Sequence, residues 1–310
     1  MKNIKPITQT KTNAVEQFAE QLSDMEAVEG RSLWQDARRR FRRNKAAMLS
    51  LLILICITSL TLFGQHFSEY SFDEPDWVAM SAPPSPESGH YFGTDTLGRD
   101  LYVRTLLGGR ISLLVGVLGA LVAVLLGTLY GATSGFLGGT VDRVMMRILE
   151  ILYGLPFMFL VILLVTFFGR NIFLIFVAIG AVSWLDMARI VRGQTLSLKQ
   201  KEFIEAAEVY GVSKWKIITR HIVPNVLGIV AVYATLLIPS MILTESFLSF
   251  LGLGVQEPMT SWGALLQEGS QTMEVAIWQL LFPAAFMMVT LFCFNFVGDG
   301  LRDALDPKDR

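Results

Sequence analysis

Charged residues are scarce in this sequence of 310 residues, and their scarcity excludes most soluble protein classes. They make up 17% of the chain, against 52% hydrophobic residues, and the mean hydropathy is +0.49. Soluble domains carry about 25% charged residues. The composition therefore excludes a disordered chain, a nucleic-acid-coating protein and most soluble enzymes. The formal net charge is only −1, but the charges are unevenly placed along the chain.

Residues that support catalysis or metal binding are also scarce. There are three histidines, and the topology expected below places His66 and His90 on the opposite side of a membrane from His221. The sequence lacks H-E-x-x-H, a G-x-S-x-G after a strand and a Walker-type phosphate loop, so we do not expect this chain to bind ATP itself. Cys56 and Cys293 lie in apolar runs and imply neither a disulfide framework nor a thiolate metal site. We expect no catalytic residue, metal or cofactor in the chain.

Long apolar runs dominate what is present. A membrane span needs roughly 20 mostly apolar residues, and its backbone groups must be satisfied internally, so such runs predict helices. The predicted spans are 46–63, 111–130, 151–168, 172–187, 226–247 and 275–297. The third contains Pro156, and the fourth follows a tight turn at 169–171. The predicted fold class is all-α, a polytopic integral membrane protein with six transmembrane helices.

The Lys and Arg residues predict the orientation of these spans. Segments 1–45, 131–150, 188–225 and 298–310 hold 10, 2, 7 and 3 of the 26 basic residues, and segment 248–274 holds none. Basic residues concentrate in cytoplasmic loops. We therefore expect both termini in the cytoplasm and loops 64–110 and 248–274 outside. The first span starts too deep in the chain for a cleaved signal peptide, so we expect a retained anchor.

Two segments beside the first span stand out. Residues 31–45 combine many arginines with Trp34, Ala37 and Phe41 at helical spacing. This pattern fits a topology signal or an amphipathic helix on the anionic inner leaflet. Loop 64–110 holds several prolines and seven acidic residues, which either solvate a surface or face a partner.

The predicted spans contain few charged residues. Glu150 and Asp186 sit at span ends, whereas ion-coupled transporters carry charges deep within their spans. A transport role would therefore need an external motor. Glycines recur every fourth residue from Gly127 to Gly135, which favours close helix packing, either within the chain or at a subunit interface.

The segment from Lys201 to Asn225 (KEFIEAAEVYGVSKWKIITRHIVPN) predicts a helical hairpin in the cytoplasm. One short helix ends at Gly211, and Ser213 is a suitable N-cap for a second helix. Pro224 suits the first turn of the fifth span. A shared helical face is expected for Phe203, Ile204, Ala207 and Tyr210. Small residues on the hairpin would let another surface approach its backbone, and Trp215 is expected to be an exposed anchor.

The spacing of this segment resembles a known family. Glu205-Ala206-Ala207, three residues, Gly211, nine residues and a block ending in Pro224 resemble the E-A-A-x3-G-x9-I-x-L-P loop of ABC importer permeases. Two positions depart from that pattern, because His221 and Val223 replace Ile and Leu. The variant H-I-[LV]-P-N is familiar in the peptide and nickel importer branch. Segments 90–113 and 245–263, and the stretches 28–41 and 298–310, also resemble that branch.

The resemblance implies a type I ABC importer transmembrane domain at residues 111–298, with a cytoplasmic coupling loop at 188–225. Before it lie a cytoplasmic tail at 1–45 and the first span with a periplasmic loop at 46–110, and after it a cytoplasmic tail at 299–310. The residues assigned to ATPase coupling are Glu205, Ala206, Ala207, Gly211, Trp215 and Pro224. Near the outer end of the fifth span, Glu245 is hypothesised to close an outer gate by bonding a partner permease; the alternative is an interfacial carboxylate that reaches water.

The resemblance also implies the partners. They are a second permease subunit of the B type, two cytoplasmic ATPase subunits of the D and F types that bind ATP and Mg, and a periplasmic oligopeptide-binding protein, all at a bacterial inner membrane with its lipid. The predicted function is a permease that forms the pathway of an oligopeptide importer by alternating access.

Three alternatives stay open at the level of the sequence. The same architecture could serve dipeptides, nickel or antimicrobial peptides. A polytopic membrane hydrolase or transferase is a second alternative, against which the scarcity of titratable residues in the spans argues. A channel or secondary carrier is the third. The sequence does not specify peptide length, residue preference or the pathway residues.

Overall fold

A computed structural model describes residues 33–169 and 172–305, without the side chains of residues 33, 34, 172–178 and 181. Within these ranges the regular elements are helices, and two isolated bridges occur in the long loop after the first span. The predicted all-α class is confirmed. Residues 1–32 of the predicted tail 1–45 and residues 306–310 of the predicted tail 299–310 lie outside the described residues, as do the turn residues 170–171.

The helices follow one another as α2 (Leu33–Arg43), α3 (Lys45–Phe63), η1 (Gly64–Phe67), α4 (Leu101–Leu137), α5 (Gly139–Tyr153), α6 (Phe157–Phe168), α7 (Ile172–Leu198), α8 (Glu202–Val209), α9 (Lys214–Ile217), η2 (Ile218–Ile222), α10 (Val223–Phe250), α11 (Trp262–Thr272) and α12 (Trp278–Leu305).

Four stretches of described helix are long and apolar enough to cross a membrane, namely Lys45–Phe67, Leu101–Leu137, Lys214–Phe250 and Trp278–Leu305. A fifth is the pair α5 and α6, which is bent by 75°. The helix predicted at 151–168 is therefore not continuous. Pro156 lacks an N–H and disfavours helical backbone at the residue before it, so the helix breaks between Tyr153 and Phe157. The helix α7 covers the fourth predicted span, and the count of six stays a prediction.

Several helices exceed their predicted bounds. The helix α4 starts ten residues before position 111, because the Asp100 side chain caps it by accepting from the Val103 N–H at 2.8 Å. This places Arg104, assigned above to an outer loop, inside the helix. At the other end of the chain, α12 continues through residues 299–305, which were expected to be a tail. Asn44 separates α2 from α3 by accepting from the Ala47 N–H at 3.1 Å, so the basic segment is a helix of its own.

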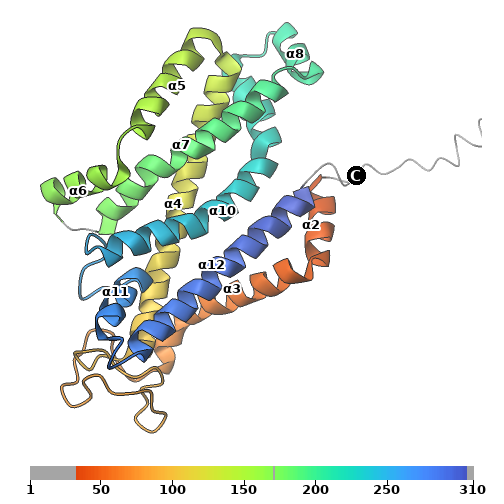
Figure 1. Ribbon diagram of the computed structural model, residues 1–310. Coiled ribbons are helices and arrows are strands. Elements are labelled where there is room, and N and C mark those ends of the chain that lie inside the picture. Colours follow the sequence, from red (N-terminus) through yellow and green to blue (C-terminus); the bar gives the residue numbers. More distant parts are fainter. Residues whose placement is uncertain (1–32, 170–171, 306–310) are drawn as a thin grey trace, which may run out of the picture.

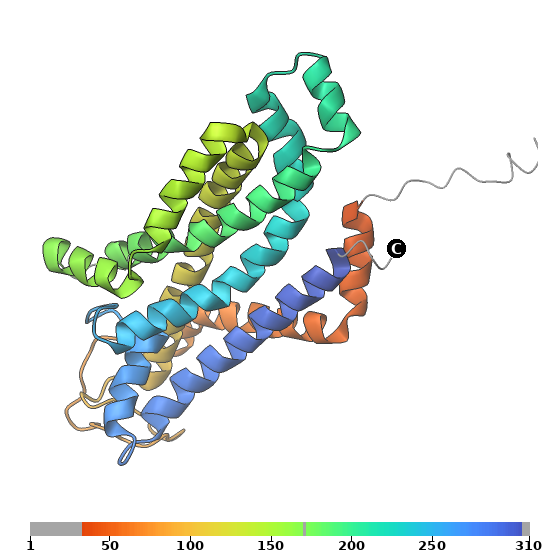
Figure 2. The same ribbon diagram turned by 45° about the horizontal axis from the view of Figure 1, so that its top comes forward.

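The long helix α4 lies at the centre of the bundle, as Figure 1 shows, and packs along α7 and α10, while α3 and α12 run side by side. The α8 segment lies at one end of the molecule and the loop at 68–100 lies with α11 at the other, which Figure 2 confirms from a second direction. We name these the hairpin end and the loop end. Gly127, Gly131 and Gly135 of α4 face α7, and a Cβ at Gly131 would lie 2.3 Å from the Ala188 carbonyl oxygen. The small residues therefore serve packing within the chain.

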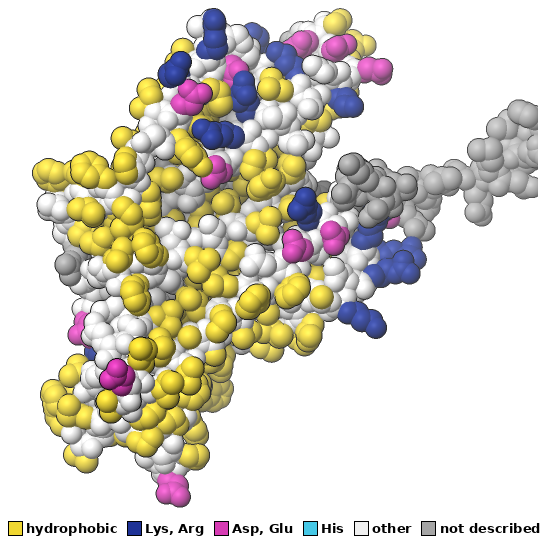
Figure 3. Space-filling view, viewed as in Figure 1, with side chains coloured by type: hydrophobic (Ala, Val, Ile, Leu, Met, Phe, Trp, Pro, Cys, Tyr) yellow, Lys and Arg dark blue, Asp and Glu magenta, His cyan; other side chains and the backbone are white. Residues whose placement is uncertain are grey.

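Charged and apolar side chains occupy different zones of the surface. In Figure 3, Lys and Arg gather at the hairpin end and around α2, whereas apolar side chains dominate the middle of that face. Large apolar residues are well exposed along α3, α4 and α6, including Leu49 (60%), Leu125 (55%) and Phe159 (61%). An apolar zone of this extent fits a surface that contacts lipid.

Candidate functional site

The hairpin at residues 201–217 projects from the bundle and is built around a glycine. The helix α8 ends at Val209, and Gly211 adopts a φ of +73°, a conformation that favours glycine. The Val212 N–H donates to the Ala207 carbonyl at 3.0 Å, and the Gly211 N–H donates to that of Glu208 at 3.0 Å. These two bonds form a Schellman motif. The break predicted at Gly211 is confirmed, while Ser213 occupies the N-cap of α9 without a side-chain cap bond.

One face of the hairpin packs against its own chain. Ile204 is 1% exposed and Ala207 is 9% exposed, and both belong to an apolar cluster with Phe136 of α4 and Val191 of α7. Ala207 was expected to face a partner, and this is corrected: it anchors the hairpin to the bundle. The shared face expected for residues 203, 204, 207 and 210 is divided in the same way, because Phe203 and Tyr210 are exposed.

The opposite face of the hairpin is open and partly apolar. Glu205, Ala206 and Gly211 are exposed, and no atom lies within 4 Å of a Cβ built on Gly211. Trp215 is 59% exposed, as expected of an anchor, and Val209 is 87% exposed. The sequence interpretation missed Val209; its apolar side chain on the face away from Ile204 and Ala207 was the available signal.

The helix that carries Trp215 does not end after one turn. The helix α9 passes through the π-helical turn η2 into α10, and Pro224 is the second residue of α10. The position expected for Pro224 at the start of α10 is therefore confirmed. The helix is continuous from Lys214 to Phe250, so the exposed Trp215 and a candidate membrane span belong to the same helix.

Polar contacts that the sequence did not predict join α4, α5 and α7 at the hairpin end. Arg192 of α7 donates from Nε and from one terminal nitrogen to the two carboxylate oxygens of Asp142 on α5, at 2.6 Å each. The Ser134 hydroxyl of α4 donates to the same carboxylate at 2.5 Å. Lys199 donates from Nζ to the Phe136 carbonyl at 2.8 Å, at the end of α4. Three helices are thereby joined under the hairpin by charge-assisted hydrogen bonds.

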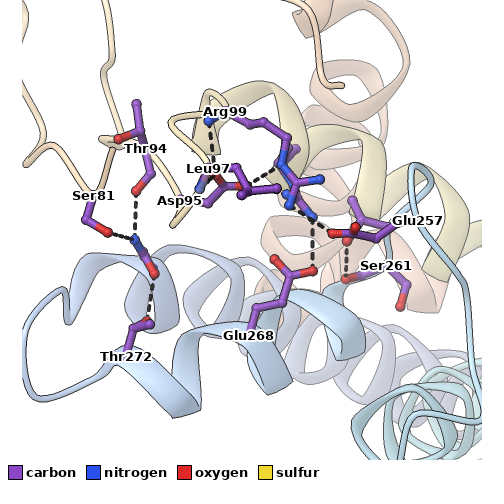
Figure 4. A network of polar contacts seen from close by, with 12 residues as sticks. Ser81, Thr94, Asp95, Leu97, Arg99, Glu257, Ser261, Glu268 and Thr272 are labelled. Carbon is purple, nitrogen blue, oxygen red and sulfur yellow. Dashed lines mark hydrogen bonds and ion pairs between the residues drawn. The ribbon is translucent and has the colours of Figure 1, made fainter. Parts of the chain in front are cut away.

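A second polar network lies at the loop end, and Figure 4 shows its members directed toward one another from the long loop, α4 and α11. The Asp95 carboxylate accepts from the Arg99 side chain at 2.7 Å and from Arg104. In turn, Arg99 pairs with Glu257 at 2.9 Å and Arg104 pairs with Glu268 at 3.0 Å. The acidic residues of loop 64–110 were expected to solvate a surface or face a partner; Asp95 instead is 3% exposed and binds its own chain.

Burial and charge act against each other in this network. Burial raises the pKa of Glu268, and the nearby charges of Arg104 and Arg99 oppose that rise. Beside the network, Nδ1 of His90 lies 2.9 Å from the Asp100 carboxylate, and the His90 ring stacks on Tyr70 with centroids 4.1 Å apart. His90 is therefore a packed structural residue of the loop. Among the described residues, no three His, Cys, Asp or Glu side chains are grouped to hold a metal ion.

The side chain of Glu245 is buried between helices of its own chain. It is 0% exposed, and its two oxygens accept from the hydroxyls of Ser112 at 3.0 Å and Ser249 at 2.6 Å. The Ser112 hydroxyl also accepts from the backbone N–H of Trp262, at 3.2 Å. The carboxylate therefore joins α4, α10 and the start of α11. It neither reaches water, as the interfacial alternative requires, nor presents a free oxygen to a partner, so the gate hypothesis has no support from its position.

Comparisons with known proteins agree with this architecture. Residues 107–310 match the family described as binding-protein-dependent transport system inner membrane component, and residues 32–84 match the N-terminal transmembrane domain of oligopeptide transport permease C. The chain is 63% identical over 305 residues to the oligopeptide transport system permease protein OppC of Haemophilus influenzae, covering 98% of each chain. It is 67% identical over 304 residues to OppC of Escherichia coli K12, covering 98% of this chain and 99% of the relative. The dipeptide transport system permease protein DppC of Bacillus subtilis is 45% identical over 280 residues, covering 90% and 87%.

Proposed function

Because this chain belongs to the family of binding-protein-dependent transport system inner membrane components, we propose that it is a transmembrane permease subunit of an ATP-driven oligopeptide importer. The relatives of highest identity quoted above carry names that specify oligopeptides, and they match nearly the full chain. The observation that carries the mechanism is the exposed face of the hairpin, with Ala206, Val209 and Trp215 open to a partner.

The proposed orientation places the hairpin end in the cytoplasm and the loop end outside a bacterial inner membrane. The gathering of Lys and Arg at the hairpin end and around α2 supports it. The partners are a second permease subunit, two cytoplasmic ATPase subunits that bind ATP and Mg, and an external oligopeptide-binding protein. The hairpin seats on one ATPase, and the external loops meet the binding protein.

Transport proceeds by alternating access. ATP binding closes the two ATPases and draws the hairpins of the two permeases together. The helix from Lys214 to Phe250 carries this displacement into the membrane, so the spans open outward to accept a peptide. Hydrolysis resets them inward. The driving force is the differential affinity of the ATPases for ATP in the two states, since a ligand shifts an equilibrium only by that difference.

The test measures peptide uptake and ATPase co-purification for Gly211→Val and Ala206→Asp at matched membrane abundance. A side chain at Gly211 strains a left-handed backbone by about 1–2 kcal/mol. It also adds bulk to the hairpin face that would contact the ATPase. The aspartate places a charge on that surface. We expect both variants to lose uptake and most of the bound ATPase, and Glu205→Ala to have a milder effect.

The matched control is Gly252→Val. Gly252 has nearly the same φ, +74°, and the same open surroundings, but lies at the loop end, away from the ATPases. We expect this control to retain the ATPase subunits. Full uptake and full ATPase recovery for Gly211→Val and Ala206→Asp together would refute the coupling role of the hairpin.

A further inference from the structure

A groove of about 460 Å³ runs between α7 and α10. Its floor is mainly aliphatic, and polar groups stand along its wall: Asp186 and Arg189 from α7, and Tyr233 and Ser240 from α10. All four residues are exposed in this chain. The groove therefore offers an apolar surface of moderate size together with a carboxylate, a guanidinium and two hydroxyls.

Tyr153, the last residue of α5, fixes the two charged side chains. Its hydroxyl donates to an oxygen of Asp186 at 3.2 Å, and the guanidinium carbon of Arg189 lies 4.3 Å from the centre of its ring. Among the described residues, no salt bridge joins Asp186 or Arg189 to another side chain. The two charges are thus held in place beside each other without neutralising each other.

The groove lies on the side of α7 that faces away from α4. Met187 and Ala188 are buried against α4, where a Cβ at Gly127 would lie 2.6 Å from that of Met187. This places Asp186 near the inner end of the apolar run 111–130, in agreement with its predicted place at the end of the fourth span.

The spacing of the charges selects a chemical partner. Residues at i and i+3 of a helix lie about 5–6 Å apart, so Asp186 and Arg189 present their groups side by side. The amino-terminal residue of any peptide carries an ammonium group next to a carbonyl oxygen. A carboxylate binds the first and a guanidinium donates to the second, whatever the side chain. The hydroxyls of Tyr233 and Ser240 suit the amides that follow, and the aliphatic floor tolerates varied side chains.

We propose that the groove between α7 and α10 is a peptide-binding surface of the translocation pathway, where Asp186 binds the amino-terminal ammonium group and Arg189 binds the first carbonyl. This assignment rests on the proposed importer function. Both residues are positioned by Tyr153, which is itself outside the groove lining.

The experiment uses the assembled complex in liposomes, with binding protein preloaded with a labelled tripeptide whose amino terminus is free or acetylated. We expect Asp186→Asn to lower uptake of the free peptide at least tenfold, and the preference for the free over the acetylated peptide to fall to unity. The matched control is Glu150→Gln, a carboxylate on α5 that is 57% exposed and does not line the groove. It should import like the wild type.

Three results would overturn the assignment. The first is Asp186→Asn import at the rate of Glu150→Gln with the preference intact. The second is loss of the second permease from the purified Asp186→Asn complex, which would show that the groove is an interface between the two permease subunits. The third is a photoreactive residue at Tyr233 that cross-links to the second permease and not to the peptide. Wild-type complex that imports no peptide with ATP would instead refute the proposed function itself.

Discussion

The substitution Gly131→Ala tests the packing of α4 against α7. A Cβ at Gly131 would lie 2.3 Å from the Ala188 carbonyl oxygen and 2.9 Å from the Arg192 nitrogen. Ordinary contacts of this kind begin near 3.4 Å. The two helices would have to move apart by about 1 Å, and both contacts are with backbone, which cannot rotate away as a side chain can.

The energetic consequence follows from that displacement. A radial gap of 0.5–1 Å forfeits about a quarter to a half of the dispersion energy of each contact it opens. Overpacking in a close-packed interior costs about 1–3 kcal/mol. The change from glycine to alanine returns part of this cost, because alanine favours a helix by about 1 kcal/mol. Gly193 on α7 supplies the reference, since nothing lies within 4 Å of its built Cβ.

The assay is thermal unfolding of the purified complex in detergent for Gly131→Ala and Gly193→Ala. We expect Gly193→Ala to match or exceed the wild type, and Gly131→Ala to be less stable than Gly193→Ala by about 1–3 kcal/mol. The helix propensity gain is common to both variants, so their difference isolates the contact. Equal stability of the two variants would refute the claim that glycine at this position sets the distance between α4 and α7.

Two further predictions concern the ion pairs, both measured by thermal unfolding. Arg104→Met is expected to destabilise the chain by about 3 kcal/mol, because it removes a buried cation from two carboxylates. Glu268→Gln should be milder, since the Glu268 side chain is 34% exposed and Arg104 keeps its pair with Asp95. Equal losses for the two variants would contradict this. Asp142→Asn is expected to cost about 1–3 kcal/mol, because a half-buried guanidinium loses its bidentate partner, whereas Arg147→Gln, in an exposed pair, should change stability by less than about 1 kcal/mol.

Features set by short-range sequence were predictable. The apolar runs located the membrane helices, and the break at Gly211 followed from the backbone freedom of one residue. The E-A-A spacing located the hairpin. The two faces of α8 were not predictable, because Ala207 and Val209 are both apolar and only the fold shows that one packs on α4 while the other is exposed.

The long-range polar contacts could not be predicted from the sequence for another reason. Arg99 and Arg104 find Glu257 and Glu268 at sequence separations of 158 and 164 residues. Nothing in the composition of segment 251–272 selects Glu257 or Glu268 as the partner of a particular arginine. The bend at Pro156 escaped as well, since a proline in an apolar run is compatible with a kinked span or a broken one.

The length of α4 has a mechanical consequence. With 37 residues and no proline, it is a rod of about 55 Å at 1.5 Å per residue. At the loop end Asp100 caps the helix, and at the hairpin end Lys199 binds the Phe136 carbonyl. The rod therefore works as a lever arm, in which a tilt of about 5° about one end displaces the other by about 5 Å over that length. A displacement at the loop end and a displacement at the hairpin end would then move the same helix, whereas Pro239 and Pro283 give α10 and α12 places to flex.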